Sequence, residues 1–201
     1  MEIKKLANNT INFIVNRFIE LVGLIISFIS ILLFVSLLSY SPEDPNFIFP
    51  EKTIINNLIG PKGSYISDLF FQSFGLISIL IPITYFFTGI NIIISKTFLI
   101  IIENTFFIII YTFIGCLFFT AFHEKSFWLT INGNNGFLGN LFEGNFLVNV
   151  INANEEFSYY LLIILILLIF LKSINFKINL ILNLLKKIFS LFSKKTIEEN
   201  N

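Results

Sequence analysis

The sequence predicts an all-α integral membrane protein with four transmembrane helices. Three observations support this fold class: 55% of the 201 residues are hydrophobic, the mean hydropathy is +0.84, and the apolar residues gather in long uncharged runs. A soluble chain of this length could not bury so much apolar surface in one core, whereas lipid can solvate it. A run of about 20 apolar residues is long enough to cross the hydrocarbon core as a helix.

Four such runs define the expected spans of a membrane domain over residues 18–171 and its immediate flank. The first, at 18–41, exceeds the roughly 7–15 apolar residues of a signal peptide, so we expect it to remain as an anchor. The second and third are expected at 68–95 and 104–122. The fourth, at 156–173, has the shortest uncharged run, and Lys172 is expected to snorkel to the interface.

The distribution of charge predicts that both termini lie in the cytoplasm. Of the 13 Lys and Arg residues, all but Lys52, Lys62 and Lys125 fall on the side of the two termini. An excess of positive charge marks the cytoplasmic side of a membrane protein. The outer loops are then expected at 42–67 and 123–155.

The two ends of the chain are expected to differ in character. Residues 1–17 are predicted to be a cytoplasmic N-terminal tail. Over residues 174–201, apolar residues recur at three- and four-residue spacing with lysines among them, which predicts a basic amphipathic helix leading towards a linker. Such a helix favours the cytoplasmic membrane surface, where anionic lipid attracts lysine. The alternative is a helix packed against a partner domain.

Two local motifs stand at the first membrane boundary. In the string Ser39-Tyr40-Ser41-Pro42-Glu43-Asp44-Pro45, the two prolines are expected to end the helix and to remove two backbone donors. In the stretch 57–69, Gly60 and Gly63 are expected to allow a turn with positive φ. Asp68 is then expected in the first turn of the second helix, where the helix dipole favours a carboxylate. Turn and cap roles are favoured for these residues over direct binding of an outer partner.

These motifs resemble the N-terminal four-helix membrane domain of the FtsK/SpoIIIE family of DNA translocases. The string from Ser39 to Pro45 is similar to the family's Ser-Tyr-x-Pro-x-Asp-Pro exit from the first span. The stretch 57–69 resembles the family's start of the second span, although Ser64 and Ser67 stand where small alanines are usual. The resemblance covers roughly residues 18–171, and its weakest part is a glycine-rich segment before the fourth span. The residues that carry it are Ser39, Tyr40, Pro42, Asp44, Pro45, Asn57, Gly60, Gly63, Asp68, Gly75, Pro82, Gly136 and Gly139.

The resemblance implies a membrane-anchoring and assembly domain of a septal DNA translocase, which couples chromosome segregation to cell division. It also implies a hexamer, contacts with cell-division proteins, and a place in the bacterial inner membrane at the division septum. The family's ATPase needs a Gly-x-x-x-x-Gly-Lys-Ser/Thr phosphate loop, and the sequence does not contain that string. ATP, Mg and DNA are therefore expected to act only through a motor domain outside this chain. For this chain itself, no catalytic residue, cofactor or metal site is predicted.

Two other functions remain open: a stand-alone membrane scaffold, and a small four-helix transporter or lipid-handling protein. An ion carrier normally keeps a charged residue at membrane depth, and none of the four runs has one near its centre. The remaining polar and aromatic candidates are expected to have structural roles. They are His123 at the interface, Cys116 as apolar filler, Trp128 in an aromatic belt, and Asn91 and Gln72 as interhelical hydrogen-bonding residues.

Overall fold

A computed structural model describes residues 2–46, 55–129 and 131–175 of the chain, and residues 2–9 by their backbone alone. Throughout these ranges the regular structure is helical, without strands. The long helices are α1 (Glu2–Leu38), α3 (Leu80–Ser95), α4 (Ile100–Phe122) and α7 (Glu155–Ser173). The shorter elements are α2 (Pro61–Phe74), the 3-10 helix η1 (Gly75–Ile79), α5 (Gly136–Asn140) and α6 (Phe146–Asn152).

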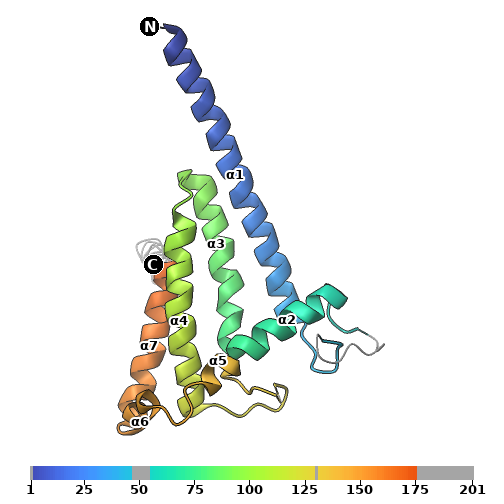
Figure 1. Cartoon of the computed structure of the whole chain (residues 1–201), viewed down its shortest axis with the longest axis vertical. Helices are drawn as coiled ribbons and strands as arrows, with labels where there is room; N and C mark the ends of the chain where they lie inside the picture. The colour runs from blue at the N-terminus through green and yellow to red at the C-terminus, as the bar shows by residue number, and fades with distance from the viewer. Residues whose placement is uncertain (1, 47–54, 130, 176–201) are drawn as a thin grey trace, which may run out of the picture.

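The predicted fold class is confirmed. Four segments of the described chain are long and apolar enough to cross a membrane: Thr10–Leu38, Pro61–Ser95, Ile100–Phe122 and Glu155–Ser173. The long helices form a row, in which α3 lies between α1 and α4, and α4 lies between α3 and α7 (Figure 1). The orientation of the termini remains a prediction. The basic amphipathic segment predicted over 174–201 lies, from residue 176 onward, outside the described residues.

The first helix is longer than the expected span at 18–41. It begins at Glu2, so that the described part of the predicted tail over 1–17 continues the same helix. Figure 1 shows its N-terminal part extending past the turn between α3 and α4. From residue 10 onward, where the structure describes its side chains, this extension carries mostly exposed residues, many of them apolar; they include Ile11, Phe13, Ile14, Val15 and Phe18.

The second span differs from the single helix expected over 68–95. α2 begins at Pro61 and ends at Phe74, and the chain turns at Gly75 into η1 and α3. In Figure 1, α2 lies at a steep angle to α3. The break occurs inside an uncharged run, at Gly75, where the chain makes the tertiary contact that is described below.

Small residues bring α1 and α3 close together. A Cβ atom on Gly89 would collide with the Ser27 hydroxyl and the Gly23 carbonyl, and would lie 2.8 Å from the Ser27 backbone nitrogen. Ser27 Oγ donates a hydrogen bond to the Phe86 carbonyl at 3.3 Å. Small residues at such positions let membrane helices approach closely enough for extensive van der Waals contact.

Gly89→Ala is therefore expected to lower the free energy of unfolding by about 1–2 kcal/mol, the usual cost of overpacking a close contact. Reversible unfolding of the purified chain in mixed micelles measures the change. Adding Ser27→Gly should recover only part of the loss, because the collision with the Gly23 carbonyl remains. Full recovery in the double variant would show that the backbones have more room than the structure indicates.

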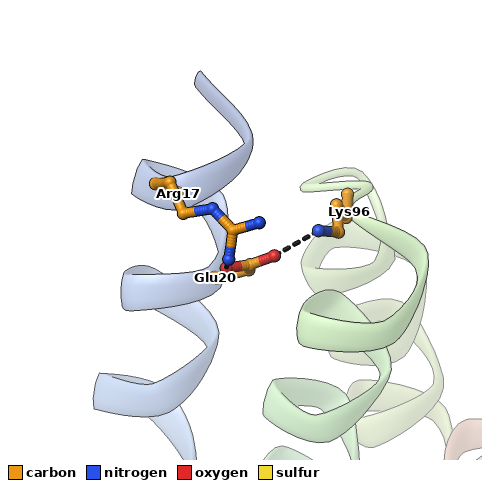
Figure 2. Close-up of polar contacts among 3 residues, drawn as sticks. All are labelled: Arg17, Glu20 and Lys96. Carbon is orange, nitrogen blue, oxygen red and sulfur yellow. Dashed lines mark hydrogen bonds and ion pairs between the residues drawn. The ribbon is translucent and has the colours of Figure 1, made fainter. Parts of the chain in front are cut away.

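An ion cluster ties α1 to the turn between α3 and α4 (Figure 2). The Glu20 carboxylate accepts from Lys96 Nζ through one oxygen and from Arg17 Nη1 through the other. Lys96 is the C-cap of α3, with a left-handed φ of 57°, and its side chain is partly exposed. The cluster joins residues that are 76 positions apart in the sequence and fixes where α1 crosses the end of α3.

Charge reversal at this cluster has an expected pattern. Glu20→Lys should lower the melting temperature in detergent because it places a cation beside Arg17 and Lys96, and the swap Glu20→Lys with Lys96→Glu should restore most of the loss. Both effects should shrink at high salt, since the pair is solvent-accessible. Glu143→Lys, the same change at an exposed acid in a turn outside the helices, is the control and should leave the melting temperature nearly unchanged. A swap as unstable as the single variant would contradict a direct pairing.

Buried polar side chains join α3, α4 and α7 within the membrane domain. Thr84 Oγ1 lies 3.1 Å from both Tyr111 Oη and Ser173 Oγ. Asn104 Nδ2 donates to Thr88 Oγ1 at 2.7 Å. Hydrogen bonds between such residues explain how polar groups are tolerated in apolar surroundings. This cluster contains no Asp, Glu, Lys or Arg.

Candidate functional site

The two motifs predicted at the first membrane boundary meet in one cluster of polar residues. We call Ser36, Ser39, Asp44, Asn57 and Ser64 the junction cluster. They come from the end of α1, the turn that follows it, the returning loop and the first turn of α2. All except Ser39 are buried, with exposures between 2% and 5%. Residues far apart in the sequence are thus held together by the side chains that carry the motifs.

Asp44 fixes the returning loop through its carboxylate. Its two oxygens accept hydrogen bonds from the backbone N–H groups of Asn56 and Asn57, each at 2.8 Å. A buried carboxylate is costly unless such donors surround it, and hydrogen bonds to charged groups are stronger than neutral ones. Asp44 therefore holds the loop against the end of the first helix.

Asn57 closes the end of α1. Its Nδ2 donates to the Ser36 carbonyl at 2.8 Å and to the Ser39 carbonyl at 3.3 Å. These carbonyls lie in the last turn of α1 and just after it, where the helix itself supplies no donors. Its Oδ1 accepts from the backbone N–H of Ile59 at 3.1 Å, and Ser39 Oγ accepts from that of Leu58 at 3.1 Å.

The glycines and prolines of the motifs play different parts. Gly60 has the predicted positive φ, at 76°, but the positive φ predicted for Gly63 is wrong because that residue lies within α2. Gly63 instead leaves room for Asn57, whose Oδ1 a Cβ atom would strike. Pro45 is buried and its carbonyl accepts from Ser64 Oγ at 2.7 Å, whereas Pro42 is exposed.

The first-turn position predicted for Asp68 is also wrong. α2 begins at Pro61, so Asp68 lies about two turns into the helix. There its Oδ1 accepts from Tyr40 Oη at 3.1 Å and from Gln72 Nε2 at 3.3 Å. Burial, and then the neighbouring Asp68 carboxylate, raise the pKa of the Tyr40 phenol, which follows the end of α1. The phenol therefore stays protonated and acts as a donor at physiological pH.

The glycine-rich segment before the fourth span packs on the bend between α2 and η1. Gly75 has φ 66°, and a Cβ atom there would collide with the Asn134 carbonyl. The same carbonyl accepts from the Leu76 N–H at 2.9 Å. Gly136 also has φ 66°, and its Cβ atom would lie 2.7 Å from the Phe74 carbonyl carbon. The carbonyl of Gly139 accepts from a buried threonine hydroxyl of α4 at 3.0 Å.

The remaining predicted residues lie apart from the junction cluster or at its edge. Trp128 packs against Tyr40 and Phe71, with ring centroids 5.8 and 5.3 Å away. His123 is an exposed C-cap of α4 beside aromatic rings, and Cys116 is fully buried. Pro82 is buried within α3. Asn91 Nδ2 donates to the carbonyl of Ile174, just after α7. The carbonyl of Gln72 accepts from Asn132 Nδ2, in the loop between α4 and α5.

Several residues at this end were missed by the sequence analysis. Ser36 lies outside both motifs, and Ser64 was noted only as a departure from the family's alanine; the folded structure shows that each bonds a distant carbonyl. Asn132, Asn134 and Asn135 hold the outer loop, and the run Asn-Gly-Asn-Asn-Gly at 132–136 was a turn signal that could have drawn attention to them.

Residues 15–186 match the family model described as the 4TM region of DNA translocase FtsK/SpoIIIE. The chain belongs to this family. It is similar to the DNA translocase FtsK of Rickettsia prowazekii (strain Madrid E), with 38% identity over 69 residues, which is 34% of this chain and 9% of that protein. It is also similar to the DNA translocase FtsK of Rickettsia bellii (strain RML369-C), with 35% identity over 80 residues, 38% of this chain and 11% of the relative. No solved structure matches it.

The FtsK/SpoIIIE match confirms the resemblance drawn from the motifs. The chain is a four-helix membrane region of a DNA translocase family, and thus a multi-pass membrane protein of a bacterium. It aligns with only about a tenth of the length of the curated relatives. In the described part of this FtsK/SpoIIIE chain, no group of three His, Cys, Asp or Glu residues is placed to hold a metal ion. The hydrogen bonds of the junction cluster hold the chain on either side of Asn57 against the end of α1.

Proposed function

We propose that this chain is the membrane-anchoring and assembly domain of a septal DNA translocase that couples chromosome segregation to cell division. The match of residues 15–186 to the FtsK/SpoIIIE membrane region is the observation that carries the proposal. The relatives it aligns with are named DNA translocases, and the aligned segment is a small part of each. In this proposal, DNA pumping and the use of ATP and Mg belong to a motor outside this chain.

The arrangement of charges supports an orientation with both termini in the cytoplasm. Arg17 and Lys96 lie together at the α3–α4 turn, while the acids of the junction motifs, Glu43, Asp44 and Asp68, lie at the opposite end of α1. A positive side facing the cytoplasm is the usual arrangement. The junction cluster then faces outward, where it can meet other cell-division proteins.

The junction cluster supports an assembly role because it fixes an exposed surface. Buried Asp44 and Asn57 hold the loop, while their neighbours Glu43, Leu58 and Lys62 are exposed on it. A surface held by buried hydrogen bonds loses little conformational entropy when a partner binds. We propose that cell-division proteins contact this surface and that further copies of the chain, in a hexamer, pack against its lipid-facing helices.

A septal localisation assay tests this function. A fluorescent protein fused after Asn201 should concentrate at the division site in the source bacterium. Replacing Pro42, Asp44 and Pro45 together with alanine should abolish that enrichment while the protein remains in the membrane fraction. Glu103→Ala is the control, since it changes an exposed acid at the start of α4, away from the junction surface. Normal enrichment of the triple variant, at wild-type abundance, would reject the role of the junction in placement.

A further inference from the structure

A polar pocket lies at the junction end of the molecule, between the end of α4, α5 and the loop that joins them. Its volume is about 430 Å³, and the polar residues that line it include Glu124, Lys125, Asn132, Asn135, Asn140 and Glu143. We propose that this pocket binds a cationic N–H donor, the guanidinium or ammonium group of an organic ligand. The inference is independent of the anchoring role.

The floor of the pocket is a chain of side-chain amides whose orientation is fixed. Asn132 Nδ2 donates to the backbone carbonyl of Gln72 at 3.2 Å, which requires its Oδ1 to face Asn140 Nδ2, at 3.3 Å. Asn140 Oδ1 in turn accepts from Asn135 Nδ2 at 2.7 Å. Because a carbonyl can only accept, the Gln72 carbonyl sets the direction of the whole chain.

This direction leaves one acceptor without a donor. Asn135 is fully buried, and its Nδ2 also donates to Thr120 Oγ1 at 3.2 Å. Its Oδ1 has no hydrogen-bond partner among the described residues. An unpaired buried acceptor costs about 1–3 kcal/mol, so a ligand that supplies an N–H group to the pocket would remove that cost.

The walls of the pocket are held in place by hydrogen bonds from Asn134 to backbone carbonyls of the loop. The side-chain Nδ2 of Asn134 donates to the carbonyls of His123 and Lys125 at 2.9 and 3.0 Å. The backbone N–H of Asn134 donates to the carbonyl of Glu124 at 2.8 Å. Gly133 has φ 65°, and a Cβ atom there would collide with the Glu124 carbonyl. The pocket is therefore formed before any ligand binds.

The charges at the pocket favour a cation. Glu124 and Glu143 are exposed at its edge, and neither has an ion pair among the residues the structure describes. Lys125 supplies one positive charge against these two negative charges. A hard metal ion prefers several carboxylate or carbonyl oxygens at once, whereas a guanidinium or ammonium group suits one buried amide oxygen and two separate carboxylates. The ligand could be a free amine or guanidine, or a basic side chain of another protein.

Equilibrium dialysis tests the proposal with the whole chain in lipid nanodiscs. The probes are radiolabelled arginine amide, a Gly-Arg-Gly peptide, and the same peptide with citrulline, a neutral counterpart of arginine. We expect saturable binding of the arginine probes and at least tenfold weaker binding of the citrulline peptide. The emission of Trp128, the single tryptophan of the chain and a neighbour of the pocket residue Leu129, should change on the same titration.

Variants at the edge of the pocket locate the binding. Glu124→Gln together with Glu143→Gln should weaken the arginine probes about five- to tenfold, as expected for two solvent-accessible charge pairs. Glu155→Gln with Glu156→Gln removes the same charge from exposed residues of α7 and should leave the affinity unchanged. These variants carry the test because Asn135→Ala would also remove the bond to Thr120 that supports the loop.

The binding results identify the source of the cation or overturn the proposal. Tighter binding of the peptide than of arginine amide identifies a protein side chain as the source, and equal binding identifies a small free cation. No saturable binding, equal binding of the citrulline peptide, displacement by Mg²⁺ at an equal concentration, or an unchanged affinity in the Glu124/Glu143 double variant would each overturn the proposal.

Discussion

Gly75→Ala is expected to lower the free energy of unfolding by more than about 3 kcal/mol, the largest effect of any single substitution considered. Two causes act together. Alanine is strained at φ 66°, and its Cβ atom would lie 2.5 Å from the Asn134 carbonyl carbon and nearer still to the oxygen. Because the obstacle is backbone, no rotamer change can relieve it. Reversible unfolding in mixed micelles, followed by the emission of Trp128, measures the loss.

Gly60→Ala separates these two causes. Gly60 has φ 76° and ψ −157°, close to the 66° and −152° of Gly75, but a Cβ atom there would meet nothing within 4 Å. Only the backbone strain then applies, at about 1–3 kcal/mol. Equal losses at the two positions would mean that contact with the outer loop does not constrain the bend.

Asp44→Ala should lower the free energy of unfolding by about 2–4 kcal/mol. The substitution leaves the buried N–H group of Asn57 without its acceptor, at a cost of about 1–3 kcal/mol, and it also removes the acceptor of the part-buried Asn56 N–H. Asp44→Asn retains one acceptor oxygen and should fall between the wild type and Asp44→Ala. The same unfolding titration measures all three proteins.

Glu43→Ala provides the control for Asp44. The two acids are neighbours in the same turn, but Glu43 is exposed, and its loss should change stability by less than about 0.5 kcal/mol. If Asp44→Ala and Glu43→Ala were equally stable, the carboxylate of Asp44 would not be holding the returning loop.

The fold class was predictable because hydropathy alone determines which segments can reside in lipid. The division of the second span was not, since residues 69–95 form an apolar run without charge. The bend depends on a carbonyl contributed by Asn134, which no local pattern in the span reveals. The start of α2 did have a local signal: proline is favoured in the first turn of a helix, and Pro61 follows a glycine with positive φ.

At the junction, the sequence predicted turn and cap residues but could not predict their partners. That Asp44 would be buried follows from the fold, because its acceptors face backbone donors 12 and 13 positions away. The unpaired acceptor Oδ1 of Asn135 could not be predicted from the sequence at all. It arises only because four polar groups, from α2, the loop between α4 and α5, and α5 itself, align in one direction.

The length of α1 has a consequence for how the protein meets the membrane surface. The segment Thr10–Leu38 has 29 residues, and at 1.5 Å per residue it is about 43 Å long, whereas a hydrocarbon core is about 30 Å thick. The solvent-accessible cluster of Arg17, Glu20 and Lys96 sets one boundary of that core, so the part of α1 that follows Glu20 spans it. The exposed apolar side chains before Arg17, among them Ile11, Phe13 and Ile14, then continue past this boundary into the interfacial region of the same leaflet.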